Sequence, residues 1–163
     1  MNTLPWVELA KKEIGVHEIE GQRDEPRVMA YFKDAGHPEI SHDETAWCAA
    51  FVGAMLQRAG LHPTGSLLAL SYEHWGDRPD HPIYGCIGVK RRRGAAAWMR
   101  HTGFVVGAND STIYLLGGNT TDEVMVAAFP RSDFTTFRWP HGFPLVELPL
   151  PTSLTAARNA TEA

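Results

Sequence analysis

Residues 47–60, WCAAFVGAMLQRAG, decide the fold, because they predict one apolar helix against which the rest of the chain can pack. A polar link, HPEISHDET, comes before this stretch, so the helix begins close to Cys48, and Gly60 is placed to end it. The other apolar residues fall on nearby faces at helical spacing: Phe51, Val52, Met55, Leu56 and Ala59.

Two shorter helices are predicted upstream of this stretch and one downstream. Thr3 is placed to cap the first, which stops at Gly15. Residues 66–75 are predicted to form the downstream helix. The second helix begins after Asp24, ends at Gly36 and carries an apolar face made of Val28, Met29, Tyr31 and Phe32.

From about residue 83 the pattern changes to short apolar segments separated by turn signals such as GANDST. Helices followed by strands favour an α+β fold in which the helices pack on one face of the sheet. Residues 1–143 are predicted to form a single domain and residues 144–163 a partly disordered tail. The strands have the spacing of an antiparallel meander, and we expect them at 83–90, 101–106, 113–116, 124–129 and 134–138.

The composition limits the function classes. The chain has 163 residues, 44% of them hydrophobic, which suffices for one core. Fifteen basic against nineteen acidic residues give a net charge of −4, so the global positive charge expected for binding nucleic acid is missing. No stretch predicts a signal peptide or a membrane span. We therefore expect a chain made in the cytoplasm that acts on the cell wall or periplasm only after release or secretion.

Cys48 and Cys86 are the two cysteines, too few for a disulfide scaffold, although one disulfide between them stays open. Eight histidines raise the question of zinc. Paired ligands such as C-x-x-C with H-x-x-x-H do not occur, and we expect no metal and no cofactor.

Cys48 is a candidate nucleophile because it stands where the predicted helix begins. Unpaired N–H groups at a helix N-terminus favour negative charge, so a thiol there is expected to be more acidic than a free one. The alternative interpretation is a small core residue, since free cysteine is commonly buried.

His101 and Asn119 are candidates for the other two members of a cysteine triad. His101 opens a predicted strand, from which its imidazole can take a thiol proton; the alternative is a surface histidine at a strand end. Asn119 follows the next strand in LLGGNTT, and a hairpin would bring it beside His101 to fix the ring. The alternative for Asn119 is ordinary turn chemistry.

At AWCAAFVGAML, HTGFVVG and LLGGNTT the chain resembles the papain-like cell-wall hydrolases of the NlpC-type and CHAP (cysteine, histidine-dependent amidohydrolase/peptidase) group. It is most similar to a compact subgroup of phage lysins and bacterial peptidoglycan hydrolases. The resemblance runs from about Trp6 to Pro140. Further matching segments are WVELAKKEIGVHEIEG, EPRVMAYF and FRWP.

This resemblance implies a papain-like α+β fold and a cysteine amidase or endopeptidase that cleaves peptidoglycan stem peptides through a thioester. It implies Cys48 as nucleophile, His101 as base and Asn119 as orienting residue. It implies a monomer that acts as an endolysin or antibacterial effector, with peptidoglycan as partner and, for an effector, an immunity protein or export machinery. A non-catalytic wall-binding relative and a papain-like acyltransferase or deamidase remain the alternatives.

Substrate contacts are predicted around the nucleophile. The candidate residues are Asp43, Glu44, Trp47 and Trp98. A solvated acidic loop is the alternative for the two carboxylates, and an anchor for its own loop is the alternative for Trp98.

The chain departs from the group in three places. Gly85-Cys86 stands where Gly-Asp is common, and Thr102 stands where the group has Val in His-Val-Gly. The insertion RRRGAAAWMR precedes His101, and residues 90–93 are predicted to form a cationic patch that binds carboxylates or is simply solvated.

Overall fold

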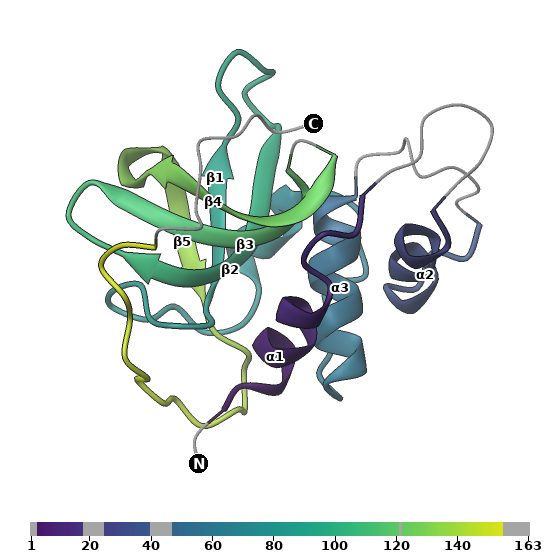
Figure 1. Ribbon diagram of the computed structural model, residues 1–163, viewed down its shortest axis with the longest axis horizontal. Helices are drawn as coiled ribbons and strands as arrows, with labels where there is room; N and C mark the ends of the chain where they lie inside the picture. Colours follow the sequence, from purple (N-terminus) through teal and green to yellow (C-terminus); the bar gives the residue numbers. More distant parts are fainter. Residues whose placement is uncertain (1–2, 18–24, 40–46, 121, 155–163) are drawn as a thin grey trace.

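The computed structural model describes residues 3–17, 25–39, 47–120 and 122–154, and for Asn119 the backbone alone. It confirms the α+β class: helices lie on one side and a five-stranded antiparallel sheet on the other (Figure 1). The elements in chain order are α1 (Pro5–Lys12), α2 (Pro26–Asp34), α3 (Cys48–Arg58), the 3-10 helix η1 (Ala69–His74), β1 (Ile87–Arg91), β2 (Arg100–Ala108), β3 (Thr112–Thr120), β4 (Glu123–Pro130), the 3-10 helix η2 (Arg131–Asp133) and β5 (Phe134–Arg138).

The helices follow the predicted pattern with local differences. α1 is capped by Leu4 rather than Thr3, and no side-chain hydrogen bond caps it. α2 is capped by the Glu25 carboxylate, which accepts from the Arg27 N–H; the predicted start at Asp24 lies outside the described residues. α3 covers the predicted helix and ends before Gly60, which has a φ of 83°. The helix predicted over 66–75 forms only the short 3-10 helix η1.

Two strand predictions are wrong in detail. The segment before β1 is a turn, because Gly85 has a φ of 86° and passes so close to α1 that a Cβ would lie 2.2 Å from Leu4 Cδ1. The Gly-Gly-Asn segment belongs to β3 and is not a turn. Asp122, just before β4, has the positive φ of 64° that is typical of a turn.

The strands β1 to β4 form the predicted meander, and β5 returns to pair with β1 at the other side, giving the order β4-β3-β2-β1-β5. The register between β1 and β2 places Lys90 opposite His101. Between β2 and β3 the paired residues end at Phe104 and Leu116. α3 approaches the sheet beyond this point, where the Thr102 N–H of β2 lies against the Cys48 sulfur.

The start of α3 is fixed by aromatic packing. Trp47 is fully buried and stacks on Tyr31 of α2, with ring centroids 5.7 Å apart. Phe51 of α3 meets Phe104 of β2 at 6.3 Å. Gly118 of β3 passes close to Trp47 and Phe51, because a Cβ there would lie 2.5 Å from the Trp47 ring and 2.8 Å from Phe51 Cβ. This packing holds the first turn of α3 against the open end of β2.

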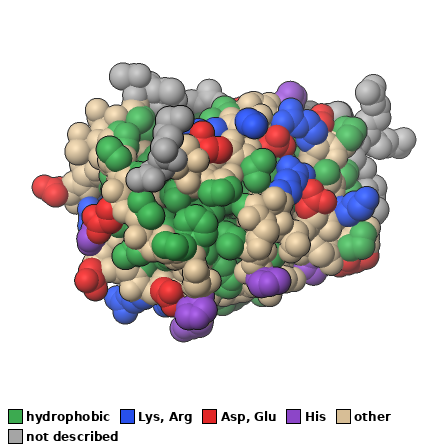
Figure 2. All heavy atoms as spheres, turned by 90° about the horizontal axis from the view of Figure 1, so that it is seen from below, with side chains coloured by type: hydrophobic (Ala, Val, Ile, Leu, Met, Phe, Trp, Pro, Cys, Tyr) green, Lys and Arg blue, Asp and Glu red, His purple; other side chains and the backbone are tan. Residues whose placement is uncertain are grey.

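The described part of the predicted tail is tied to the sheet. Ala108 N–H donates to the Pro151 carbonyl at 2.9 Å, and the Asn109 side chain donates to the Thr152 carbonyl at 2.8 Å. The last residues, 155–163, lie outside the described part. Hydrophobic side chains gather in the middle of the face shown in Figure 2, with charged and histidine side chains around them.

Both cysteines are free and buried, so no disulfide joins Cys48 and Cys86. Among the residues described, no helix has the length and apolar character to cross a membrane.

Candidate active site

Cys48 is the first residue of α3 and lines an open groove on the surface. Its residue is 8% exposed, so the thiol is largely shielded but not sealed in the interior. The backbone N–H groups of Cys48, Ala49 and Thr102 lie against the sulfur, the last one from the beginning of β2. The nucleophile candidate therefore sits at a helix N-terminus that also meets a strand amide.

The thiol is less acidic than the sequence predicted. Burial raises the pKa of Cys48, and the Thr102 N–H, the Arg92 charge and the first amides of α3 only partly oppose that effect. Desolvation disfavours the thiolate more than the helix start favours it. At rest and near neutral pH, Cys48 is therefore a thiol.

His101 lies on β2, is 2% exposed and packs 5.7 Å from the Phe129 ring. Burial is the largest cause that lowers the pKa of His101 to about 3, and the neighbouring charges of Lys90 and Arg92 contribute to the same shift. The imidazole is therefore neutral at physiological pH.

Backbone connectivity brings His101 close to the sulfur. The Thr102 N–H that contacts Cys48 belongs to the peptide bond that follows His101, so it is two covalent bonds from the His101 Cα. Among the hydrogen bonds of the described residues, none joins the Cys48 sulfur to the His101 ring. A neutral thiol thus lies beside the strand position that carries a neutral imidazole, without an ion pair.

Thr120 is the residue that contacts the His101 ring. Its Oγ1 lies 3.2 Å from His101 Nε2, and both side chains are buried. Asn119, the predicted orienting residue, precedes it on β3, and its side chain lies outside the described part. Sequence reasoning missed Thr120, although it stands in the same Asn-Thr-Thr segment. This contact engages Nε2 of the His101 ring.

The predicted substrate contacts have different outcomes. Trp98 lines the groove with Cys48 and is 55% exposed. Trp47, in contrast, is 0% exposed, which corrects its prediction as a substrate contact: its ring belongs to the core beneath the site. Asp43 and Glu44 lie outside the described residues.

The cationic patch predicted at residues 90–93 is not one patch. Lys90 is 1% exposed, lies in the same cross-strand pair as His101, and donates from Nζ to the Arg91 carbonyl at 2.8 Å. Arg92 lines the groove, whereas Arg93 pairs with Asp133 at 2.8 Å. Burial lowers the pKa of Lys90 to about 8. Sequence reasoning missed Lys90 as part of the site, because a lysine in a basic run usually faces water.

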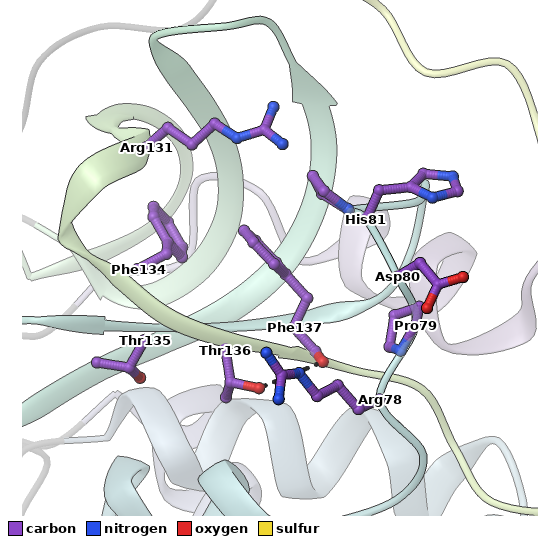
Figure 3. A pocket seen from close by; sticks show the side chains of 10 residues that line it. Arg78, Pro79, Asp80, His81, Arg131, Phe134, Thr135, Thr136 and Phe137 are labelled. Carbon is purple, nitrogen blue, oxygen red and sulfur yellow. Dashed lines mark hydrogen bonds between the residues drawn. The ribbon is translucent and has the colours of Figure 1, made fainter.

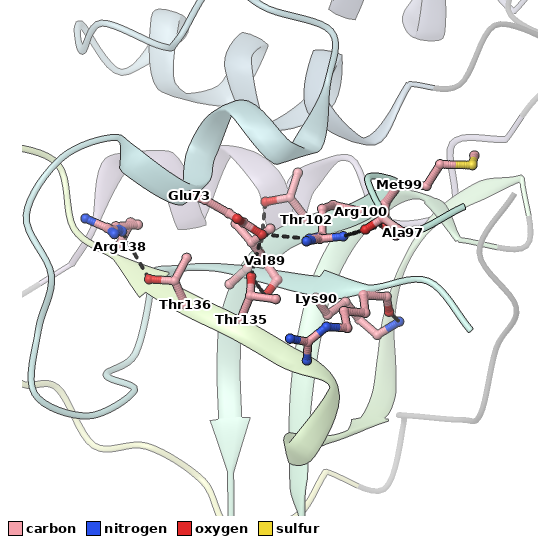
Figure 4. A network of polar contacts seen from close by, with 12 residues as sticks. Glu73, Val89, Lys90, Ala97, Met99, Arg100, Thr102, Thr135, Thr136 and Arg138 are labelled. Carbon is pink, nitrogen blue, oxygen red and sulfur yellow. Dashed lines mark hydrogen bonds and ion pairs between the residues drawn. The ribbon is translucent and has the colours of Figure 1, made fainter. Parts of the chain in front are cut away.

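The two walls of the groove are tied together by one ion pair (Figure 4). One wall is formed by residues 67–70, which lead into η1. The other wall is the turn that carries Trp98. Glu73 of η1 accepts from Arg100 Nε at 2.7 Å, and Arg100 also donates to the carbonyls of Ala97 and Met99, on either side of Trp98. The same carboxylate accepts from the Thr135 hydroxyl at 2.7 Å. These contacts fix the width of the groove.

A second cavity, of about 450 Å³, lies between the loop before β1 and the strand β5 (Figure 3). Phe134 and Phe137 stack there with centroids 5.4 Å apart, and Arg78 and Arg131 line it. It is larger than the Cys48 groove of about 160 Å³ but holds neither cysteine. Cys48 lines the smaller groove and contacts the amide that follows His101, so the candidate active site is there.

Comparisons with protein-family models, with curated proteins and with solved structures found no match to this chain. The molecule itself defines the class: an α+β protein with a helix-start cysteine and a buried histidine at one end of an antiparallel sheet.

Proposed function

We propose that the protein is a cysteine amidase or endopeptidase that hydrolyses amide bonds in bacterial peptidoglycan peptides. The observation that carries the proposal is the position of Cys48: first residue of α3, open to a groove, and in contact with the amide that follows His101. A buried structural cysteine has no need of such a groove. Cys86, which is 0% exposed, has none.

In this mechanism the neutral pair reacts by general base catalysis. Cys48 Sγ attacks the substrate carbonyl while its proton passes to His101 Nδ1, and Thr120 Oγ1 holds the ring at Nε2. In this proposal the Cys48 N–H, at the beginning of α3, donates to the oxyanion. His101 then gives the proton to the leaving amine, and water hydrolyses the thioester.

The peptidoglycan substrate rests on the resemblance of AWCAAFVGAML, HTGFVVG and LLGGNTT to NlpC-type and CHAP hydrolases. The α+β class and the helix-start position of the cysteine are compatible with that group. The papain-like fold and the triad of Cys48, His101 and Asn119 are part of the same proposal, with Thr120 added as a ring contact.

Digestion of purified sacculi tests the proposal. We expect wild-type protein to release soluble muropeptides, whose masses identify the bond, and Cys48→Ser to release none. Cys86→Ala is the matched control, because it removes the other thiol, which is buried away from the groove, and should keep activity. Release that persists in Cys48→Ser would remove Cys48 from the mechanism. Binding to sacculi without release would favour a wall-binding protein, and selective labelling of Cys48 without release would favour acyl transfer.

A further inference from the structure

The groove beside Cys48 is unusually apolar for a site that meets solvent. Four large hydrophobic residues of the described chain are strongly exposed: Ile14, Leu68, Trp98 and Leu145. Two of them, Leu68 at 51% and Trp98 at 55%, line this one groove. Single exposed hydrophobic residues are normal on a surface, but two that face one small groove with a thiol indicate a ligand.

The rest of the lining has the same character. Leu67, Leu70 and Met99 complete the apolar walls, and the polar side chains at the groove are arginines. Arg100 is engaged by Glu73 and by backbone carbonyls, so it acts as part of the wall. No carboxylate lines the groove within the described residues. An apolar side chain fits these walls, because packing against Leu67, Leu68 or Met99 removes its apolar surface from water.

The walls are also held in place. The Glu73–Arg100 ion pair connects η1 to the turn around Trp98, with its two side chains only 17% and 13% exposed (Figure 4). The indole of Trp98 is thus carried by a turn whose backbone is fixed on both sides. A groove of defined width selects among substrates by the size and polarity of what enters it.

We propose that this groove binds an apolar side chain of the substrate, on the residue next to the scissile carbonyl, so that bonds with a large apolar group at this position are cleaved in preference to bonds with a small one. The proposal rests on the proposed function only in taking Cys48 as the nucleophile. A substrate whose carbonyl reaches the sulfur must place its neighbouring group against Leu68, Trp98 or Met99.

The rate at which maleimides label Cys48 tests whether the groove binds an apolar group, and this measurement does not require turnover. N-methyl-, N-cyclohexyl- and N-(2-carboxyethyl)maleimide carry the same electrophile and differ in the group that would occupy the groove. Modification of Cys48 is followed by mass spectrometry at pH 8.5, with Cys48→Ala as the background for Cys86, and each rate is divided by the rate with glutathione. We expect the normalised rate for the cyclohexyl reagent to exceed that for the methyl reagent by on the order of tenfold.

Three variants locate the effect. Leu68→Asn and Trp98→Ala should each reduce the cyclohexyl preference several-fold, while Leu145→Asn, an equally exposed leucine that does not line the groove, should leave it unchanged. Thermal melts check that each variant is folded, which their exposure favours.

The outcomes separate the two proposals. Equal normalised rates for all three reagents, or a preference for the carboxyethyl reagent, would overturn the inference. The inference would also be overturned if Leu68→Asn and Trp98→Ala leave the cyclohexyl preference unchanged. If no reagent labels Cys48, both the inference and the proposed function fail. If the cyclohexyl preference is found and sacculi still release nothing, the groove inference stands and the wall substrate is wrong.

Discussion

Lys90→Met should make the protein more stable. Lys90 is a nearly fully buried cation that lies opposite His101 across β1 and β2. Its Nζ donates to the Arg91 carbonyl and lies 4.6 Å from the centre of the Phe129 ring. Methionine keeps much of the length and volume of this side chain and removes its charge.

The size of the effect follows from the pKa of Lys90. Burial lowers this pKa from 10.5 to about 8, and at 1.36 kcal/mol for each pH unit the charged form costs about 3 kcal/mol of folding free energy at pH 7. Methionine loses the hydrogen bond to the Arg91 carbonyl, worth about 1 kcal/mol. We therefore expect the free energy of unfolding to rise by about 2 kcal/mol at pH 7.

The pH dependence gives this prediction a specific sign. Between pH 8 and 10.5 the native Lys90 has lost its proton while the unfolded lysine still holds it, so the wild type gains stability across this window. The advantage of Lys90→Met should therefore shrink as the pH rises from 8 toward 10.5. Removing the charge should also raise the pKa of His101, because Lys90 is among the causes that lower it.

Urea denaturation at pH 7, 8.5 and 10 measures the stability difference, and NMR titration of the His101 ring follows its pKa. Lys33→Met, on the exposed side of α2, is the control and should change stability by less than about 0.5 kcal/mol. The reasoning is refuted if Lys90→Met is less stable than the wild type at pH 7. A stability difference that stays constant with pH would refute it as well.

Three further predictions follow from the site and its support. Thr120→Val removes the hydroxyl 3.2 Å from His101 Nε2 and should slow muropeptide release on the order of tenfold, more than Asn119→Ala does; the reverse order would give the orienting role to Asn119. Gly118→Ala places a Cβ 2.5 Å from the Trp47 ring and should lower the free energy of unfolding by about 1–3 kcal/mol in urea, and an unchanged midpoint would contradict this packing. Glu73→Gln breaks the ion pair with Arg100 and should cost about 1–3 kcal/mol, whereas Arg93→Gln, at an exposed pair, should have little effect; equal losses in thermal melts would show that burial does not distinguish the two pairs.

Much of the fold was predictable because its signals are local. The apolar spacing of residues 47–60 and the glycine after them define α3, and β5 was predicted with its observed bounds, 134–138. The turn at Gly85 was not predictable, because its cause is the approach of Leu4, some eighty residues away in the sequence. The same holds for β3, whose two glycines look like a turn until Trp47 is placed above Gly118.

The helix and strand positions of Cys48 and His101 were predictable, and the environment around them was not. Cys48 and His101 are chemically distinctive, and a helix start and a strand start are local features. Lys90 and Thr120 become part of the site only through strand register, which sets Lys90 opposite His101 and Thr120 at its ring. The acidity expected for Cys48 was wrong for the same reason: burial is a property of the whole fold, and here it outweighs the helix start.

The charges around the site explain what kind of chemistry it favours. Arg92 stabilises a thiolate at Cys48 but, together with Lys90, opposes a proton on His101, so the two cations work against a resting thiolate–imidazolium pair. In the attack on a carbonyl, negative charge develops on the oxyanion as well as on sulfur, and a neighbouring guanidinium favours that charge too. A site that is neutral at rest and polarised by nearby cations suits a reaction in which the proton moves only when substrate is bound. An apolar group in the groove would strengthen this arrangement, because it excludes water and so increases the effect of Arg92 on the developing charge.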